Sequence, residues 1–174
     1  MPGRPEGRAG LVVLGLDPGS RATGFGLVRE RSGQAGLVAA GVIRLPAGRD
    51  IYERLGIIYE KVARLIKEHA PDEAAVENVF VSANTASALK LGQARGAAIA
   101  ACAVAGLPVA GYEPSKVKQA VAGAGRAGKD QVAFMVARVL GVKGATWPAD
   151  ASDALAVAVC HLNLRRFRKL AGLV

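Results

Sequence analysis

The sequence predicts a single α/β domain, and three observations lead to this fold class. Residues 11–16, LVVLGL, carry no polar side chain, and such a run suits a strand buried on both faces. Residues 50–70 repeat apolar side chains at helical spacing. Three strand-like segments come first and helices then alternate with strands, an order typical of a mixed sheet with helices on its faces. We expect residues 1–10 to be a disordered N-terminal extension and residues 11–170 to form one domain.

Turn and capping residues set the boundaries of the elements. Ser32 and Gly33 join the second and third strands, which form an antiparallel meander with the first. Asp50, with Glu53 three residues later, opens the first helix as a capping box. The expected strands span residues 11–16, 23–31, 36–45, 73–77 and 107–112; the expected helices span 50–70, 84–105 and 130–140, with a short helix from Pro114 and a long one from 149.

Composition and charge favour a protein that binds a polyanion. The 23 Lys and Arg residues outnumber the 14 Asp and Glu residues, a formal charge of +9. Such an excess favours nucleic acid as the partner, although a basic surface that only aids solubility gives the same count. Cys102 and Cys160 lie among apolar residues without CxxC spacing, as buried thiols of a reducing compartment do. No apolar run approaches a membrane span and no signal-peptide core is present, so we expect a cytoplasmic protein.

Four carboxylates occupy unusual places in this pattern. Asp17 follows the first buried strand, and Glu77 ends the fourth. Asp150 and Asp153 are three residues apart, so they share one face of the last helix. Either of these two, taken alone, is an ordinary acid of a helix N-terminus, and one of them would be a cap. Because functional groups of α/β sheets gather beyond the carboxyl ends of the strands, we expect all four to converge there.

Convergence of these carboxylates predicts a metal site. Four such charges would repel one another strongly at neutral pH. Mg²⁺ or Mn²⁺ relieves this repulsion, because hard divalent cations prefer oxygen ligands. Two such ions about 3.5–4 Å apart hold both the attacking water and the leaving oxygen of a phosphodiester. Without these four acids, 10 acidic residues face 23 basic ones, so a strongly basic surface would surround the acidic pocket.

Three segments resemble one known family. LGLDPGSRATGFGLV, AVENVFVSANTASALKLGQARGA and PADASDALAVAVCH are similar, in residues and in spacing, to the RuvC Holliday-junction resolvases of bacteria. The similarity runs from about Leu11 to His161, and ALKLGQARG is its most specific motif. The resemblance implies a ribonuclease-H-like mixed five-stranded sheet and a homodimer with two active sites. It also implies paired nicks in four-way DNA junctions during recombination and repair, and a RuvA–RuvB branch-migration complex as a partner.

The resemblance also implies roles for individual residues. The family's lysines near the scissile phosphate fall on Lys118 and Lys129, which would otherwise be solvated charges. Its aromatic residue against junction bases falls on Phe80, although a lone Phe is more often a core residue. From the residues themselves, Arg126 in the Gly-rich segment 121–130 is a weaker candidate for a phosphate contact. The family's catalytic, metal-binding acids fall on Asp17, Glu77, Asp150 and Asp153.

Other polar residues are excluded from the site or left open. His161 is eleven residues past Asp150, about 16 Å along a helix axis at 1.5 Å per residue, so we expect it to be structural. His69 lies at a helix end. Lys90 and Arg95 share the Ala-rich helix and face either DNA or solvent. With no histidine within reach, the metal must activate the attacking water.

Three rival functions stay open at this point. DPGSRATGFGLV also resembles the phosphate loop of actin-like ATPases and sugar kinases, although 174 residues are too few for two such domains. A non-catalytic DNA-binding module would explain the charge but not the four acids. A nuclease for RNA–DNA hybrids would keep the chemistry and change the substrate, and the close motif match argues against it. The sequence therefore predicts a Mg²⁺-dependent endonuclease that resolves Holliday junctions.

Overall fold

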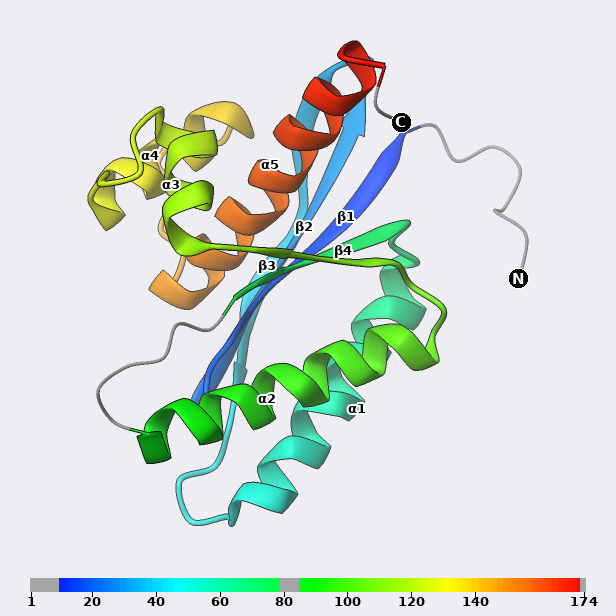
Figure 1. The fold of residues 1–174 in the computed structure, drawn as a ribbon, viewed down its shortest axis with the longest axis vertical. Helices are drawn as coiled ribbons and strands as arrows, with labels where there is room; N and C mark the ends of the chain where they lie inside the picture. The colour runs from blue at the N-terminus through cyan, green and yellow to red at the C-terminus, as the bar shows by residue number, and fades with distance from the viewer. Residues whose placement is uncertain (1–9, 79–84, 173–174) are drawn as a thin grey trace.

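The computed structural model describes residues 10–78 and 85–172, which form a five-stranded sheet between two layers of helices (Figure 1). The strands are β1 (Leu11–Pro18), β2 (Ala22–Arg31), β3 (Gln34–Arg44), β4 (Glu73–Glu77) and β5 (Val109–Tyr112), and the helices are α1 (Ile51–His69), α2 (Thr85–Val104), α3 (Pro114–Ala122), α4 (Lys129–Val139) and α5 (Ala149–Leu170). The sheet order is β3-β2-β1-β4-β5. The first three strands pair antiparallel, whereas β4 runs parallel to β1 and β5 parallel to β4. The predicted mixed α/β sheet is confirmed.

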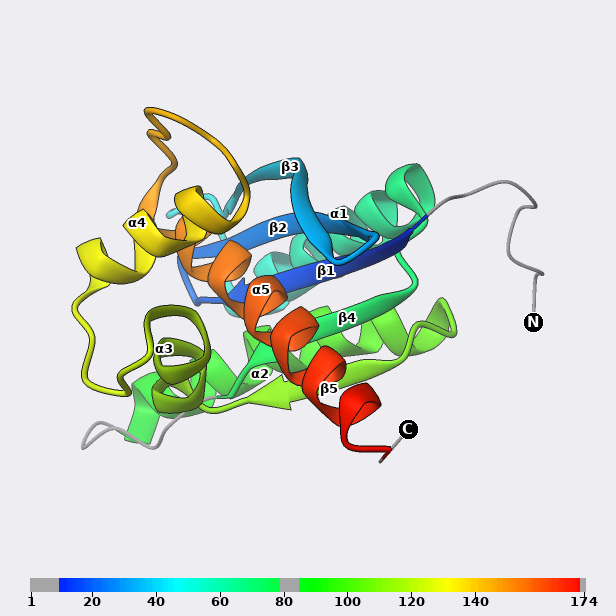
Figure 2. The same cartoon turned by 90° about the horizontal axis from the view of Figure 1, so that it is seen from above.

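The central strand β1 is buried on both faces because its side chains alternate between two cores. Val12, Leu14 and Leu16 pack with residues of α1 and α2. Val13 faces the other way and belongs to the core that α5 fills. The views of Figure 1 and Figure 2 place α1 and α2 on one face of the sheet and α5, flanked by α3 and α4, on the other. This two-sided burial explains the unbroken apolar run of residues 11–16.

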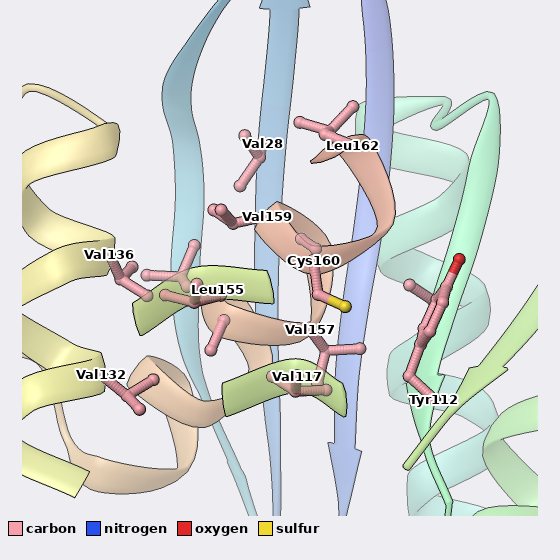
Figure 3. Packing of buried hydrophobic residues seen from close by; sticks show 14 of the residues in the cluster. Val28, Tyr112, Val117, Val132, Val136, Leu155, Val157, Val159, Cys160 and Leu162 are labelled. Carbon is pink, nitrogen blue, oxygen red and sulfur yellow. The ribbon is translucent and has the colours of Figure 1, made fainter. Parts of the chain in front are cut away.

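The long helix α5 is the centre of the second core. Between Ala151 and Leu162 every residue of α5 except Asp153 is buried. Figure 3 shows its apolar side chains packed among residues of β2, α3, α4 and β5. The helix backbone approaches the sheet closely over glycine: a Cβ added to Gly15 would lie 2.1 Å from the Ala154 carbonyl oxygen.

Every predicted boundary lies within two residues of the observed one. The Asp50 half of the expected capping box is confirmed, since the Asp50 side chain accepts a hydrogen bond of 2.9 Å from the Glu53 backbone amide, while the Glu53 carboxylate accepts one from Arg49. One difference bears on the site. We expected β1 to end at residue 16, but pairing with β2 extends it to Pro18, with Asp17 opposite Gly24. Asp17 is therefore held by the sheet rather than by a turn.

Both cysteines are confirmed as buried free thiols. Burial raises the pKa of Cys102 and of Cys160 to about 11, so neither is a reactive thiolate. In residues 10–78 and 85–172, no helix combines the length and the apolar character that a membrane span needs.

Candidate active site

Asp17 and Glu77 lie at the carboxyl ends of two neighbouring parallel strands. Leu16 pairs with Val76, so the next residues of the two strands stand side by side. Since side chains alternate along a strand and Leu16 and Val76 point to the α1–α2 core, Asp17 and Glu77 both point to the α5 side. Glu77 also hydrogen-bonds to the Asp17 carboxylate. The register of the sheet alone thus brings two of the predicted acids together.

The first two turns of α5 supply the other two acids. The N-cap of α5 is Pro148, which makes no side-chain cap bond, so neither Asp150 nor Asp153 serves as the cap. The helix start is pressed against β2, because a Cβ added to Gly24 would lie 1.9 Å from the Asp150 carbonyl oxygen. Gly24 is the strand partner of Asp17. The absence of a side chain at Gly24 therefore lets α5 carry its acids to the end of β1.

The electrostatics show that these carboxylates interact. Burial, and then the charges of Asp153 and Asp150, raise the pKa of Asp17 to about 6. Burial, and then the charges of Asp17 and Asp153, raise the pKa of Glu77 to about 7. Four acids from three elements thus share one electrostatic environment.

Two lysines border the same cluster. The Lys129 ammonium, at the start of α4, donates a hydrogen bond of 2.8 Å to Oδ2 of Asp153, and this bond raises the pKa of Lys129. The positive charge of Lys118, on α3, acts to lower the pKa of Glu77. Both lysines line a cavity of about 190 Å³ together with Glu77 and Asp153. The structure therefore places both predicted lysines beside the acids.

The donor chemistry of the cluster fits a divalent cation. Its ligands would all be carboxylate oxygens, and the raised pKa values of Asp17 and Glu77 reflect a repulsion that a cation would relieve. Within the described residues, no three Asp, Glu, His or Cys side chains are grouped round a single point as metal ligands. One oxygen of Asp153 is instead held by Lys129. The acids are thus near enough to interact electrostatically, and a bound cation would draw them closer, with the second oxygen of Asp153 still free to ligate it.

Arg95 holds the end of β4, a role that the sequence left open. Its Nε donates to the Glu77 carbonyl oxygen at 3.1 Å, and its Nη2 donates to Oδ1 of Asn78 at 2.7 Å. Asn78 in turn donates to Oε1 of Glu113 at 3.0 Å. Arg95 therefore faces inward and fixes the backbone that carries the Glu77 carboxyl group. Helical spacing on α2 gave no signal for this contact, since it depends on how α2 packs on the sheet.

The remaining candidate residues divide into three groups. Phe80 lies outside the described residues. Arg126 lies on the connection between α3 and α4, where it is exposed. His161 is buried away from the acids, where its Nδ1 is 2.7 Å from the Tyr112 hydroxyl and its Nε2 is 2.5 Å from Oε2 of Glu73. The expectation that His161 is structural is confirmed.

The sheet order and the acids beyond β1 and β4 define a class, the ribonuclease-H-like nucleases. A sequence model described as crossover junction endodeoxyribonuclease RuvC matches residues 13–161. The crossover junction endodeoxyribonuclease RuvC of Solidesulfovibrio magneticus is 64% identical over 92% of this chain and 95% of the relative. That of Oleidesulfovibrio alaskensis is 60% identical over 94% of this chain and 97% of the relative. This chain therefore belongs to the RuvC family of crossover junction endodeoxyribonucleases.

Solved structures agree with the family assignment. A T. thermophilus RuvC in complex with a Holliday junction substrate is 38% identical, with a TM-score of 0.85 over 90% of this chain and 96% of that chain. A yeast mitochondrial Holliday junction resolvase, 11% identical over 94% of this chain and 86% of that chain, has a TM-score of 0.65 and shares the fold.

Proposed function

We propose that this chain is a Holliday-junction resolvase, an endonuclease that nicks four-way DNA junctions in recombination and repair. One observation carries the proposal: four carboxylates from β1, β4 and α5 interact electrostatically, in a chain that belongs to the RuvC family. The formal charge of +9 supports a polyanionic substrate. A non-catalytic DNA-binding module gives no reason for such an acidic cluster within a basic protein.

The site would hold Mg²⁺, two ions per active site, with Mn²⁺ as a substitute. Asp17, Glu77, Asp150 and Asp153 would be the ligands, since all offer the carboxylate oxygens that hard cations prefer. When bound, the metal supplies an activated water and stabilises the charge that develops on the leaving oxygen. A cation would also remove the repulsion that raises the pKa of Asp17 and of Glu77.

The lysines would act on the phosphate group itself. Lys118 and Lys129 line the cavity at the acids, so their ammonium groups would bind the non-bridging oxygens of the scissile phosphate. Hydrolysis joins the water oxygen to phosphorus and breaks the bond to the 3′ oxygen, which takes up a proton. The products are 5′-phosphate and 3′-hydroxyl ends. Arg126, on the neighbouring loop, would contact a phosphate farther along the strand, and Phe80 would contact junction bases.

The proposed reaction also implies an oligomeric assembly. Two symmetric nicks in one junction require two active sites, so we propose a homodimer. A RuvA–RuvB branch-migration complex would be the partner that presents the junction, and the cytoplasm the place of action. Residues 11–170 would form the single nuclease domain, after a disordered extension of residues 1–10.

Cleavage of a synthetic, partly mobile four-way junction, beside a linear duplex of the same sequence, tests the proposal. We expect paired symmetric nicks only in the junction, in Mg²⁺ and not in EDTA. Asp17→Asn should reduce the cleavage rate about a thousandfold, because one acid of the cluster loses its charge. Glu60→Gln, which neutralises an exposed acid on α1, is the matched control and should cleave like the wild type. Equal cleavage of junction and duplex, or full activity of Asp17→Asn, would contradict the proposal.

A further inference from the structure

A second cavity lies close to the acid cluster and is lined by basic side chains. It has a volume of about 890 Å³ and lies between the β1–β2 turn, the β3–α1 loop and the first turns of α1 and α2. Its basic lining residues are Arg21, Arg49, Arg54 and Lys90, and none of its lining residues, all in the described part of the chain, is acidic. We name it the basic cleft. In Figure 1 these segments meet at the lower end of the molecule, where β1 also ends.

Arg54 lines the basic cleft and joins the two loops that border it. Its Nη2 donates to the Ala47 carbonyl oxygen at 2.6 Å and its Nη1 to the Ser20 carbonyl oxygen at 3.4 Å, so it ties the two loops together. A backbone bond of 3.1 Å from Leu45 to the Arg21 carbonyl adds a second tie. The Arg54 Nε is buried and has no hydrogen-bond partner within the described residues. The half-buried charge of Arg54 therefore meets two carbonyl groups and no carboxylate, which favours an anionic ligand.

The other basic residues add to this positive charge. Arg21 and Lys90 are exposed and form no ion pair with any residue that the structure describes. Arg49 pairs with Glu53 at 2.9 Å, but both side chains are about half exposed, so the pair is weak. The basic cleft thus gathers several positive charges at one place on the surface, as a binding site for phosphate groups does.

The position of the basic cleft relates it to the proposed cleavage site. Ser20 follows Asp17 by three residues, and an extended chain spans at most about 3.6 Å per residue, so their Cα atoms lie within about 11 Å of each other. A DNA strand advances about 3.4 Å per nucleotide. Ser20, which lines the basic cleft, is therefore at most about three such steps from Asp17, so a strand held at the acids can reach the cleft. The basic cleft also lies on the α1–α2 side of the sheet, whereas Lys118 and Lys129 lie on the α3–α4 side.

We propose that the basic cleft binds phosphodiester groups of the DNA strand that passes through the active site, within a few nucleotides of the scissile phosphate. Arg21 and Lys90 are the phosphate contacts, and Arg54 positions the loops that carry the cleft. DNA would then be held on both sides of the acids, by the two lysines on one side and by the basic cleft on the other. This inference rests on the proposed function, because it places its ligand relative to the scissile phosphate.

Salt-dependent binding tests the inference. The affinity for a fluorescent four-way junction is measured in EDTA over a range of salt concentrations, for the wild type and for Arg21→Gln/Lys90→Gln. The slope of log K against log salt should fall by about 2, since each phosphate contact contributes about 0.9. At 0.1 M salt this slope change corresponds to a loss of affinity of roughly 60-fold. Arg31→Gln/Lys67→Gln is the matched control, because it removes the same charge from exposed positions of β2 and the last turn of α1.

The outcomes separate this inference from the proposed function. An unchanged slope in Arg21→Gln/Lys90→Gln, or an equal change in the control, overturns the inference, while cleavage by the wild type keeps the proposed function. A wild type that neither binds nor cleaves junctions overturns both. A third arm measures the melting temperature in Mg-ATP. A stabilisation of the wild type that the double variant loses would assign the basic cleft to a nucleotide and overturn the DNA assignment.

Discussion

At the scale of single residues, the environment of Asp17 determines its chemistry. Burial and the neighbouring charges of α5 raise its pKa to about 6, and that of Glu77 to about 7. Between their ordinary values near 4 and these raised values, the folded protein holds protons that the unfolded chain releases. Proton binding therefore stabilises the metal-free fold, and its stability falls as the pH rises from about 4 to about 7.

Asp17→Asn should reverse part of this loss, because the variant removes one of the repelling charges. In EDTA at about pH 8 we expect its melting temperature to exceed that of the wild type by about 2–4 °C, which corresponds to about 1 kcal/mol for a chain of this size. At about pH 5 the difference should be smaller, since the wild-type carboxyl groups are then largely protonated. Calorimetry at both pH values measures it, with Glu60→Gln as the control. A gain that is larger at the lower pH would contradict the assigned repulsion.

His161 shows how a buried polar residue is satisfied by hydrogen bonds away from the four acids. It lies between the Tyr112 hydroxyl and the Glu73 carboxylate, and Arg165 donates to the other oxygen of Glu73 at 3.0 Å. Burial alone would raise the pKa of Glu73, but the hydrogen bond from His161 and the charge of Arg165 outweigh it and leave the pKa lowered. The helical rise along α5 sufficed to exclude His161 from the site. Its partners were not predictable, because they come from strands 49 and 88 residues away.

At the scale of elements, the packing of α5 on the sheet decides whether the acids meet. The first turn of α5 packs so close to the Gly24 backbone that no side chain would fit between them. The residue pattern of TGFGLV predicts a strand but assigns its glycines no role. Glycine is unfavourable within a strand unless something approaches closely, so the two glycines of this segment were the available signal.

Gly24→Ala should move the start of α5 away from β2. The added methyl group would meet the Asp150 carbonyl oxygen, and a displacement of the acids of about 1 Å costs about 100-fold in cleavage rate. We also expect a loss of stability of roughly 1–3 kcal/mol, measured by urea unfolding. Gly36→Ala on β3 is the control, because a Cβ there meets nothing within 4 Å. If Gly24→Ala cleaves junctions like Gly36→Ala, close packing of α5 is not what positions the acids.

At the scale of the whole molecule, both helical layers share one sheet, so the described domain should unfold as a unit. Trp147, the single tryptophan of the sequence, packs against the α5 core. Its fluorescence therefore reports on the start of α5, while far-UV circular dichroism reports on all helices. We expect the two urea transitions to coincide. An earlier fluorescence transition would show that the part of the molecule round the active site unfolds separately, and would contradict a single domain.

The strands, the helices and the expectation that the acids converge could be predicted from the sequence, and the reasons are physical. Strand burial and helical spacing are local patterns, and strand ends of a parallel sheet share one edge. The inward orientation of the Arg95 side chain and the basic cleft could not be predicted from the sequence. Both depend on how α2 lies against the sheet and against α1, and no local pattern encodes the angle between two packed layers.

The late position of α5 in the chain has a consequence for synthesis in the cell. β1 and β4 carry Asp17 and Glu77, but Asp150 and Asp153 are added only with the start of α5. A nascent chain on the ribosome therefore has half of the acids and an open, uncovered sheet face. Until α5 emerges and docks, the carboxyl groups of β1 and β4 therefore lack the neighbouring charges of Asp150 and Asp153.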